Sequence, residues 1–196
     1  IPPIDHVLSP ARQAPSVGKT ERSAFLLWLL LFCFLLSKHA LWRDELQSFL
    51  VATRTETWGE FWSGIRHERT PPLLYFLQRI LWKFSLLREL GVDHFVPLVT
   101  APFSVAFVYL WMFKVEGLTR MERVCAPFSV FILREYGVIS RAYPIGLTFM
   151  ALAACAQQRK NIGLALFCLA VAGMSHTLIF LICAGLALRL LWRQHQ

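Results

Sequence analysis

The feature that most constrains this chain is a long apolar run from Ala24 to Trp42, which Lys38 and His39 interrupt only near its end. A helix of this length crosses the hydrocarbon core of a bilayer, which takes about 20 apolar residues. Of the whole chain, 56% is hydrophobic and only 16% is charged, which is more apolar than a soluble domain of 196 residues tolerates. The sequence therefore predicts an integral membrane protein.

Further apolar segments follow, and short basic clusters separate them. The clusters at 114–123, 159–160 and 189–193 are expected in the cytoplasm together with the N-terminal tail, because Lys and Arg gather on that side of a membrane. We predict an all-α, polytopic transmembrane helical bundle of about six spans, with the remaining loops on the outer face. The expected spans, alternately outward and inward, are 24–42, 95–113, 122–138, 142–158, 161–175 and 176–192.

Residues 1–23, with prolines among polar residues, are expected to form a flexible cytoplasmic tail, and residues 24–196 the membrane domain. The first outer loop would then be 43–94. Because the sequence starts at Ile1 and stops beside a basic helix end, we expect it to be incomplete at the C-terminus and part of a longer protein.

The apolar segment 71–87 allows two interpretations. As a spanning helix it would place Arg79 and Lys83 near the hydrocarbon, at about 2.5 to 3.5 kcal/mol each, and it would move the 114–123 cluster outside. As an amphipathic helix it would lie in the outer interface, with its cations away from an apolar stripe. We favour the interfacial helix, and the aromatic residues of 46–62 suit a second one at headgroup depth.

The composition also narrows the partners. The net charge of +8 is spread over clusters between apolar runs and forms no single basic face, so nucleic acid is not an expected partner. No glycine-rich phosphate loop is present, which disfavours a nucleotide-sugar substrate. The five cysteines all lie in apolar runs, where packing is their expected role.

Asp44 and Glu45 follow the first apolar run directly, so the predicted topology holds both carboxylates at the outer membrane surface. An acceptor hydroxyl or amine that attacks a carbon centre must lose a proton as the new bond forms, and either carboxylate could receive it. The alternative is that both cap an interfacial helix, where a negative charge near the N-terminus is favoured by about 0.3–1 kcal/mol.

Four motifs occur in a fixed order along this framework. They are WRDELQSF, which begins at Trp42, ERTPPLLYFL at Glu68, EYGVISRAYPIGL at Glu135 and SHTLIFL at Ser175. In this order, and all on the predicted outer side, they resemble the N-terminal half of the GT-C membrane glycosyltransferases. The nearest group is the dolichyl-phosphate-mannose protein mannosyltransferase and aminoarabinose-transferase type, which uses polyprenyl-phosphate sugars. The resemblance covers about residues 24–192.

The resemblance implies roles for particular residues. Asp44 matches the Asp of the family's Asp-Glu pair and would be the catalytic base, with inversion at the anomeric carbon. Arg141 matches an Arg beside a Tyr, here Tyr143, and would bind the donor phosphate, for which the planar guanidinium is well shaped. The alternative for Arg141 is that it anchors the start of a span by snorkelling.

The sequence departs from the family pattern at two positions. Ile139 stands where many members carry an acid, which leaves Glu135, next to Tyr136, as the nearest carboxylate. Thr70 stands where relatives often have His or Lys. His67, Glu68 and Arg69, just upstream, are candidate contacts for the donor or the acceptor, with a solvated loop as the alternative.

His176 lies at the outer end of the fifth expected span, where relatives often show a His. It is a candidate ligand or proton relay, although a lone His at an interface also serves as a polar anchor. No metal-ligand spacing is present, so metal dependence stays open and no cofactor is predicted with certainty.

The sequence thus predicts a membrane glycosyltransferase that moves a sugar from a polyprenyl-phosphate donor to a protein, lipid or glycan acceptor on the outer or lumenal face. The expected location is the bacterial inner or plasma membrane in preference to the endoplasmic reticulum, with membrane lipids around the bundle. The alternative is a transporter or a lipid-binding scaffold subunit without turnover.

Overall fold

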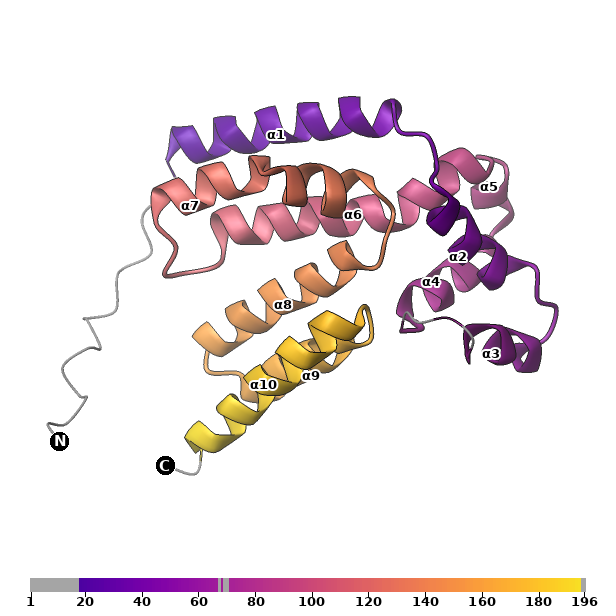
Figure 1. The fold of residues 1–196 in the computed structure, drawn as a ribbon. Helices are drawn as coiled ribbons and strands as arrows, with labels where there is room; N and C mark the ends of the chain where they lie inside the picture. The colour runs from indigo at the N-terminus through magenta and orange to yellow at the C-terminus, as the bar shows by residue number, and fades with distance from the viewer. Residues whose placement is uncertain (1–17, 67, 69–70, 195–196) are drawn as a thin grey trace, which may run out of the picture.

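The computed structural model describes residues 18–66, 68 and 71–194, and this part of the chain is helical without a strand (Figure 1). The expected all-α class is confirmed. The elements are α1 (Lys19–Ser37), α2 (Arg43–Thr53), α3 (Trp58–Arg66), α4 (Leu73–Trp82), α5 (Ser85–Arg88), α6 (Val92–Phe113), α7 (Arg120–Cys125), the 3₁₀ turn η2 (Ala126–Phe128), the π-helix η3 (Phe131–Val138), α8 (Tyr143–Gln158), α9 (Ile162–Gly173) and α10 (Thr177–Gln194).

The helices form two layers and an end cap. In one layer α1 and α6 run alongside the segment from α7 to η3, while α8, α9 and α10 form the second layer, and α2 to α5 gather at one end (Figure 1). Buried aromatic and aliphatic side chains such as Trp28, Phe32 and Met112 fill the first layer. The second layer packs through smaller residues, among them Ala165 and Ala172, which let its helices approach closely.

Two helices, α1 and α6, are long and apolar enough to cross a membrane, and η3 with α8 adds a third if this pair, bent by 116°, is one span. The structure therefore supports membrane-helix character. The six expected spans are not confirmed, since α9 has 12 residues and rises only about 18 Å.

The first span is shifted relative to the prediction, because α1 begins at Lys19 and ends at Ser37 in place of 24–42. The side chain of Glu21 accepts a hydrogen bond from Gly18 N–H at 3.0 Å, which satisfies an orphan donor at the helix start. The expected tail therefore ends before Lys19. Residues 1–17, which hold most of that tail, lie outside the described residues.

The expected span 122–138 is wrong as a single helix, since it divides into the end of α7, η2 and η3. Pro127 lies at this break and favours it, because proline lacks the N–H that an α-helix needs and its ring clashes with the preceding turn, although α6 continues through Pro97 and Pro102. The freed carbonyl of Pro127 accepts a hydrogen bond from Trp28 Nε1 of α1 at 3.0 Å, so a packed side chain compensates for the missing turn.

The segment 71–87 forms α4 and the short α5, and α4 rises only about 15 Å over its 10 residues. Its length is too short to span, in agreement with the favoured prediction. Arg79 is 6% exposed and donates to the carbonyls of Ala52, Thr55, Glu56 and Thr57. This cation therefore holds the link between α2 and α3.

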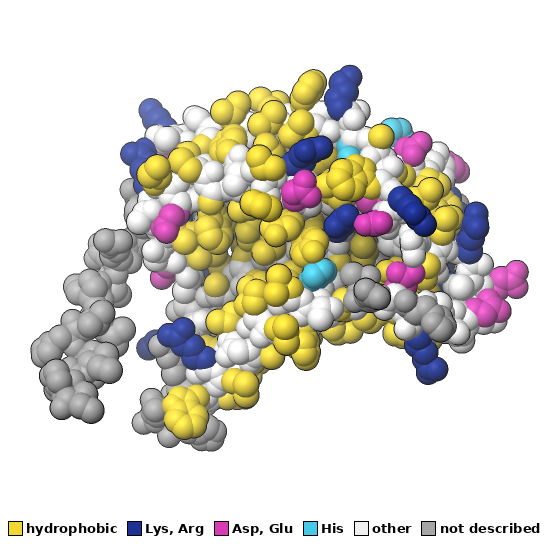
Figure 2. Space-filling view, viewed as in Figure 1, with side chains coloured by type: hydrophobic (Ala, Val, Ile, Leu, Met, Phe, Trp, Pro, Cys, Tyr) yellow, Lys and Arg dark blue, Asp and Glu magenta, His cyan; other side chains and the backbone are white. Residues whose placement is uncertain are grey.

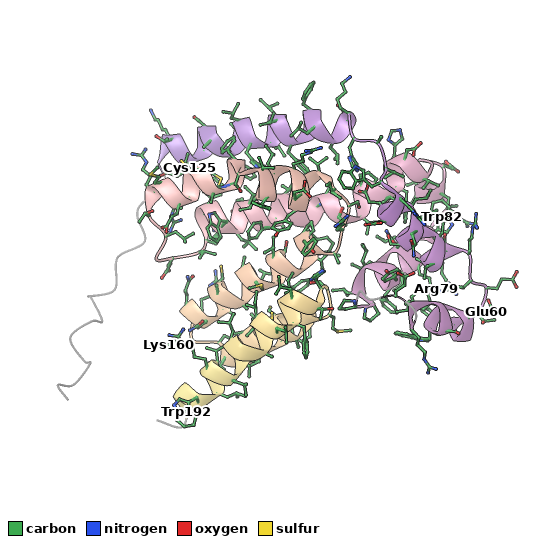
Figure 3. The ribbon with its side chains drawn as sticks, viewed as in Figure 1. Glu60, Arg79, Trp82, Cys125, Lys160 and Trp192 are labelled. Atoms are coloured by element: carbon green, nitrogen blue, oxygen red, sulfur yellow. The ribbon has the colours of Figure 1, made fainter. Side chains whose placement is uncertain are left out.

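The bundle has two ends, and the labelled side chains mark them. Arg79, Trp82 and Glu60 lie at the end formed by α2 to α5, whereas Cys125, Lys160 and Trp192 lie at the opposite end (Figure 3). The C-terminus of α1 and the N-termini of α6, α8 and α10 all point to the α2–α5 end (Figure 1). The loops expected on the outer face thus share one end of the molecule.

Candidate functional site

The candidate site begins at the N-terminus of α2, where the apolar helix α1 has ended and the chain turns. Asp44 and Glu45 both lie in the first turn of α2, beside the backbone N–H groups that have no helical partner. Adjacent residues on a helix point in different directions, so the two carboxylates enter different surroundings. Glu45 turns into the protein and Asp44 toward the surface.

The Glu45 carboxylate is buried, with no exposed side-chain surface, and it connects three segments. Its oxygens lie 2.9 and 3.0 Å from His39 Nε2 in the link after α1. Trp42 N–H donates to Oε2 at 2.6 Å, and Ser140 N–H donates to Oε1. Glu45 therefore serves as the cap of α2 and as the tie between this helix and the turn before α8.

Asp44 has the opposite environment, since 68% of its side-chain surface is exposed. Its Oδ2 accepts a hydrogen bond from Arg141 Nη2 at 2.9 Å, although the two residues are 97 positions apart. The Arg141 guanidinium carbon also lies 5.9 Å from the centre of the Trp42 ring. The two main residues of the predicted site thus meet at one ion pair.

The turn between η3 and α8 places Arg141. Ser140 Oγ donates to the Val96 carbonyl at 2.7 Å and lies 2.7 Å from Thr100 Oγ1, which fixes the turn against α6. Arg141 N–H donates to the Ile139 carbonyl at 2.8 Å, and this tight turn reverses the chain before α8. Of the Arg141 guanidinium nitrogens, Nε is buried without a hydrogen-bond partner among the described residues.

A row of three rings borders the ion pair. Tyr143 stacks at a tilt between Tyr136, with ring centres 4.9 Å apart, and His176, with ring centres 4.3 Å apart. His176 Nδ1 accepts a hydrogen bond from Leu178 N–H at 3.2 Å, so the neutral ring carries its proton on Nε2. Burial, and secondarily the charge of Arg141, hold the pKa of His176 below its usual value of 6.5.

The ion pair of Asp44 and Arg141, together with Tyr143 and His176, lines a cavity of about 350 Å³. The charged and histidine side chains of the visible face gather mainly toward the α2–α5 end, while hydrophobic side chains dominate its centre (Figure 2). The lining residues are Asp44, Gln47, Ser48, Glu68, Pro71, Leu74, Tyr75, Ser140, Arg141, Ala142, Tyr143 and His176. A polar cavity at the ends of apolar helices suits a ligand with a charged head that reaches the membrane surface.

The structure brings together five of the predicted residues, namely Asp44, Glu68, Arg141, Tyr143 and His176. Tyr136 contacts the cavity only through Tyr143, and Glu135 does not line it. Glu45 lies beside the cavity but is committed to its buried partners. The predicted contacts His67 and Arg69 lie outside the described residues.

Sequence reasoning did not single out Gln47, Tyr75 and Ser140, which also line the cavity. Gln47 Nε2 donates to Glu68 Oε1 at 3.0 Å, and Tyr75 OH donates to Glu68 Oε2 at 3.4 Å. The helical spacing held a signal for Gln47, because a residue three positions after Asp44 shares its face. Nothing in the local pattern marks Tyr75, whose position depends on how α4 packs on α2.

Within the described ranges, no group of three His, Cys, Asp or Glu side chains is close enough to hold a metal ion. Comparisons with models of known protein families, with curated proteins and with solved structures find no match. The site geometry is therefore the basis for the functional proposal.

Proposed function

We propose that this chain is a membrane glycosyltransferase, which moves a sugar from a polyprenyl-phosphate donor to an acceptor on the outer or lumenal face. The observation that carries the proposal is the meeting of Asp44 and Arg141 in one cavity, 2.9 Å apart, at the ends of apolar helices. A proton acceptor and a phosphate-binding cation are the two groups that this reaction needs.

In the proposed reaction an acceptor hydroxyl or amine attacks the anomeric carbon of the donor. The bond from this carbon to the phosphate oxygen breaks, and the lipid phosphate leaves with the electron pair. Asp44 takes the proton of the attacking group and is suited to this because it is the more exposed of the two adjacent carboxylates. A single displacement of this kind inverts the anomeric configuration.

Arg141 would stabilise the charge that develops on the leaving phosphate. Its Nη2 is bonded to Asp44, while the buried Nε has no partner among the described residues and can donate to a phosphate oxygen. A phosphate that binds the guanidinium competes with Asp44 for it. Donor binding would therefore weaken the ion pair and leave the Asp44 carboxylate more available as a base.

The row of rings supports the same ligand chemistry. His176 stays neutral near pH 7 because its pKa is lowered, so it adds no charge beside Arg141 and offers one N–H donor. Tyr143 holds this ring by stacking. A neutral donor beside a cationic phosphate site suits the hydroxyl groups of a sugar.

The proposal includes the GT-C-like organisation with about six spans, in which the two layers of Figure 1 lie in the membrane and α2 to α5 cover the outer surface. The N-terminus and the basic clusters at the opposite end would face the cytoplasm. The bacterial inner or plasma membrane is the proposed location, and the acceptor is a protein, a lipid or a glycan.

The test is transfer of radiolabelled sugar from a panel of polyprenyl-phosphate sugars by the purified protein. Asp44→Asn should abolish transfer, and Arg141→Ala should abolish it or raise the donor KM strongly. Asp93→Asn and Arg88→Ala are matched controls, because they remove exposed charges of the same kinds at the same end of the molecule and line no described part of the cavity.

Transfer by the wild type and by both controls, with loss in Asp44→Asn, would establish the enzyme and its base. Full activity of Asp44→Asn would refute the assigned base. Donor lipid that binds to the wild type without any transfer would favour a lipid-binding scaffold.

A further inference from the structure

A second cavity, of about 450 Å³, lies at the end of the bundle opposite the candidate site. Its lining comes from α6, α7 and the link between them in the first layer and from α8 and α9 in the second, toward the end of the bundle at which Lys160 lies (Figure 3). Its lining residues are Leu110, Phe113, Lys114, Glu116, Arg123, Leu152, Cys155, Ala156, Gln158, Arg159, Leu164 and Cys168. None of them belongs to the site already described.

The charges around this cavity are mainly positive. Three cations, Lys114, Arg123 and Arg159, stand against one carboxylate, Glu116, which leaves a net charge of +2. Arg123 is 4% exposed and donates to the carbonyls of Met112, Val115 and Leu118, so it is fixed in place with its charge unneutralised. A buried charge of this kind is screened less than one in water.

The other two cations are available to a ligand. Lys114 follows the last residue of α6 and Arg159 follows the last residue of α8, and both are exposed. Among the described residues neither side chain makes a hydrogen bond or an ion pair, and the Lys114 ammonium only lies 5.8 Å from the Tyr109 ring centre. Two free cations from separate helices thus stand at the mouth of one cavity.

Below these cations the wall is apolar, with Leu110, Phe113, Leu152 and Leu164 from three helices. A hydrocarbon chain that packs on this wall is stabilised, because apolar surface is removed from water. A free inorganic anion has no apolar surface to bury there. The net charge of +2 favours an anionic headgroup over a zwitterionic one. Basic pockets between membrane helices on the cytoplasmic side bind the headgroups of anionic lipids for this reason.

We propose that this cavity binds one anionic glycerophospholipid, with its phosphate between Lys114 and Arg159 and an acyl chain along the apolar wall. The lipid fills the wedge between α6 and the pair α8 and α9. The site is independent of the proposed catalytic function, because it uses no residue of the Asp44 cavity and lies at the other end of the bundle.

The experiment is titration of the purified chain in detergent with phosphatidylglycerol, with bound lipid counted by native mass spectrometry. The double variant Lys114→Gln, Arg159→Gln should bind about 30-fold more weakly, which is the factor expected for the loss of two cations near an anionic headgroup. The matched control is Lys19→Gln, Lys160→Asn, which removes two exposed cations at the same end that do not line the cavity and should bind as the wild type does.

Two further arms identify the ligand. Phosphatidylcholine should bind at least tenfold more weakly than phosphatidylglycerol, and inorganic phosphate should not displace the bound lipid. Equal binding by the Lys114, Arg159 variant with unchanged helicity would overturn the proposal. Equal binding of phosphatidylcholine would show a charge-independent groove, and displacement by inorganic phosphate would show a simple anion site, so either result also overturns it.

Discussion

The adjacent carboxylates Asp44 and Glu45 allow a sharp test of the structure, because each can be replaced by its own amide. Glu45→Gln and Asp44→Asn are the same chemical change one position apart in the first turn of α2. Glu45 has no exposed side-chain surface, whereas Asp44 is 68% exposed. We expect the first change to destabilise the protein strongly and the second to do so only slightly.

The magnitude for Glu45→Gln follows from its partners. One carboxylate oxygen accepts from Trp42 N–H and the other from Ser140 N–H, and both face His39 Nε2. A glutamine has one acceptor oxygen, so in either orientation its NH₂ group faces a backbone donor. An unpaired buried donor costs about 1–3 kcal/mol, and loss of the charge-assisted bonds adds to this, so the expected loss is about 3 kcal/mol.

For Asp44→Asn the expected loss is below about 1 kcal/mol, because exposed ion pairs contribute little to stability. Thermal unfolding in detergent, followed by circular dichroism, should then show a Tm lower by about 6–12 °C for Glu45→Gln and nearly unchanged for Asp44→Asn. Equal Tm values for the two variants would refute the assignment of Glu45 to the buried junction. A larger loss in Asp44→Asn would do the same.

Three further predictions concern other parts of the fold. Arg79→Met should lower the free energy of unfolding by about 2–4 kcal/mol, because several loop carbonyls lose their donor. Lys83→Met, at the C-cap of the same helix, removes a cation that donates to none of these carbonyls and should lower it much less. Thermal unfolding and proteolysis at residues 53–57 compare the two variants. Gly146→Ala should destabilise the packing of α8 against the start of α10, since the added methyl group overlaps the side chains of Ser175 and Ile179. Gly185→Ala meets open space and should be neutral or stabilising. Tm values check both predictions. Because the pKa of His176 is lowered in the folded protein, the unfolded chain binds more protons between pH 6.5 and the folded-state pKa. The free energy of unfolding should therefore fall as the pH drops through 6.5 toward the folded-state pKa. His176→Gln should weaken this dependence when unfolding is measured across that range.

The helical class and the end of the molecule that bears the site could be predicted from the sequence, because both depend on local patterns. Apolar runs as long as 95–113 leave few alternatives to helix, and α6 occupies nearly that range. Pro127 lies at the break in 122–138, but Pro97 and Pro102 lie inside α6, so a proline alone does not predict where an apolar segment breaks.

The distinction between Asp44 and Glu45 could not be predicted in the same way. Both are acids in the first turn of a helix, and each is compatible with capping or catalysis when read alone. What separates them is the position of Ser140, 95 residues further along the chain, whose backbone N–H meets Glu45 and not Asp44. Long-range contacts of this kind leave no periodic trace in one sequence.

The buried junction and the exposed ion pair are coupled through the backbone, and this coupling explains how the site is held. Glu45 accepts a hydrogen bond from the N–H of Ser140, and the ion pair forms between their chain neighbours, Asp44 just before Glu45 and Arg141 just after Ser140. The exposed pair contributes little energy of its own and can open when a ligand competes for Arg141. The junction beneath it stays closed because the Glu45 carboxylate is buried and accepts from two backbone N–H groups while also facing His39. The protein therefore keeps Asp44 and Arg141, the two main residues of the proposed site, in register while leaving the contact between them free to exchange.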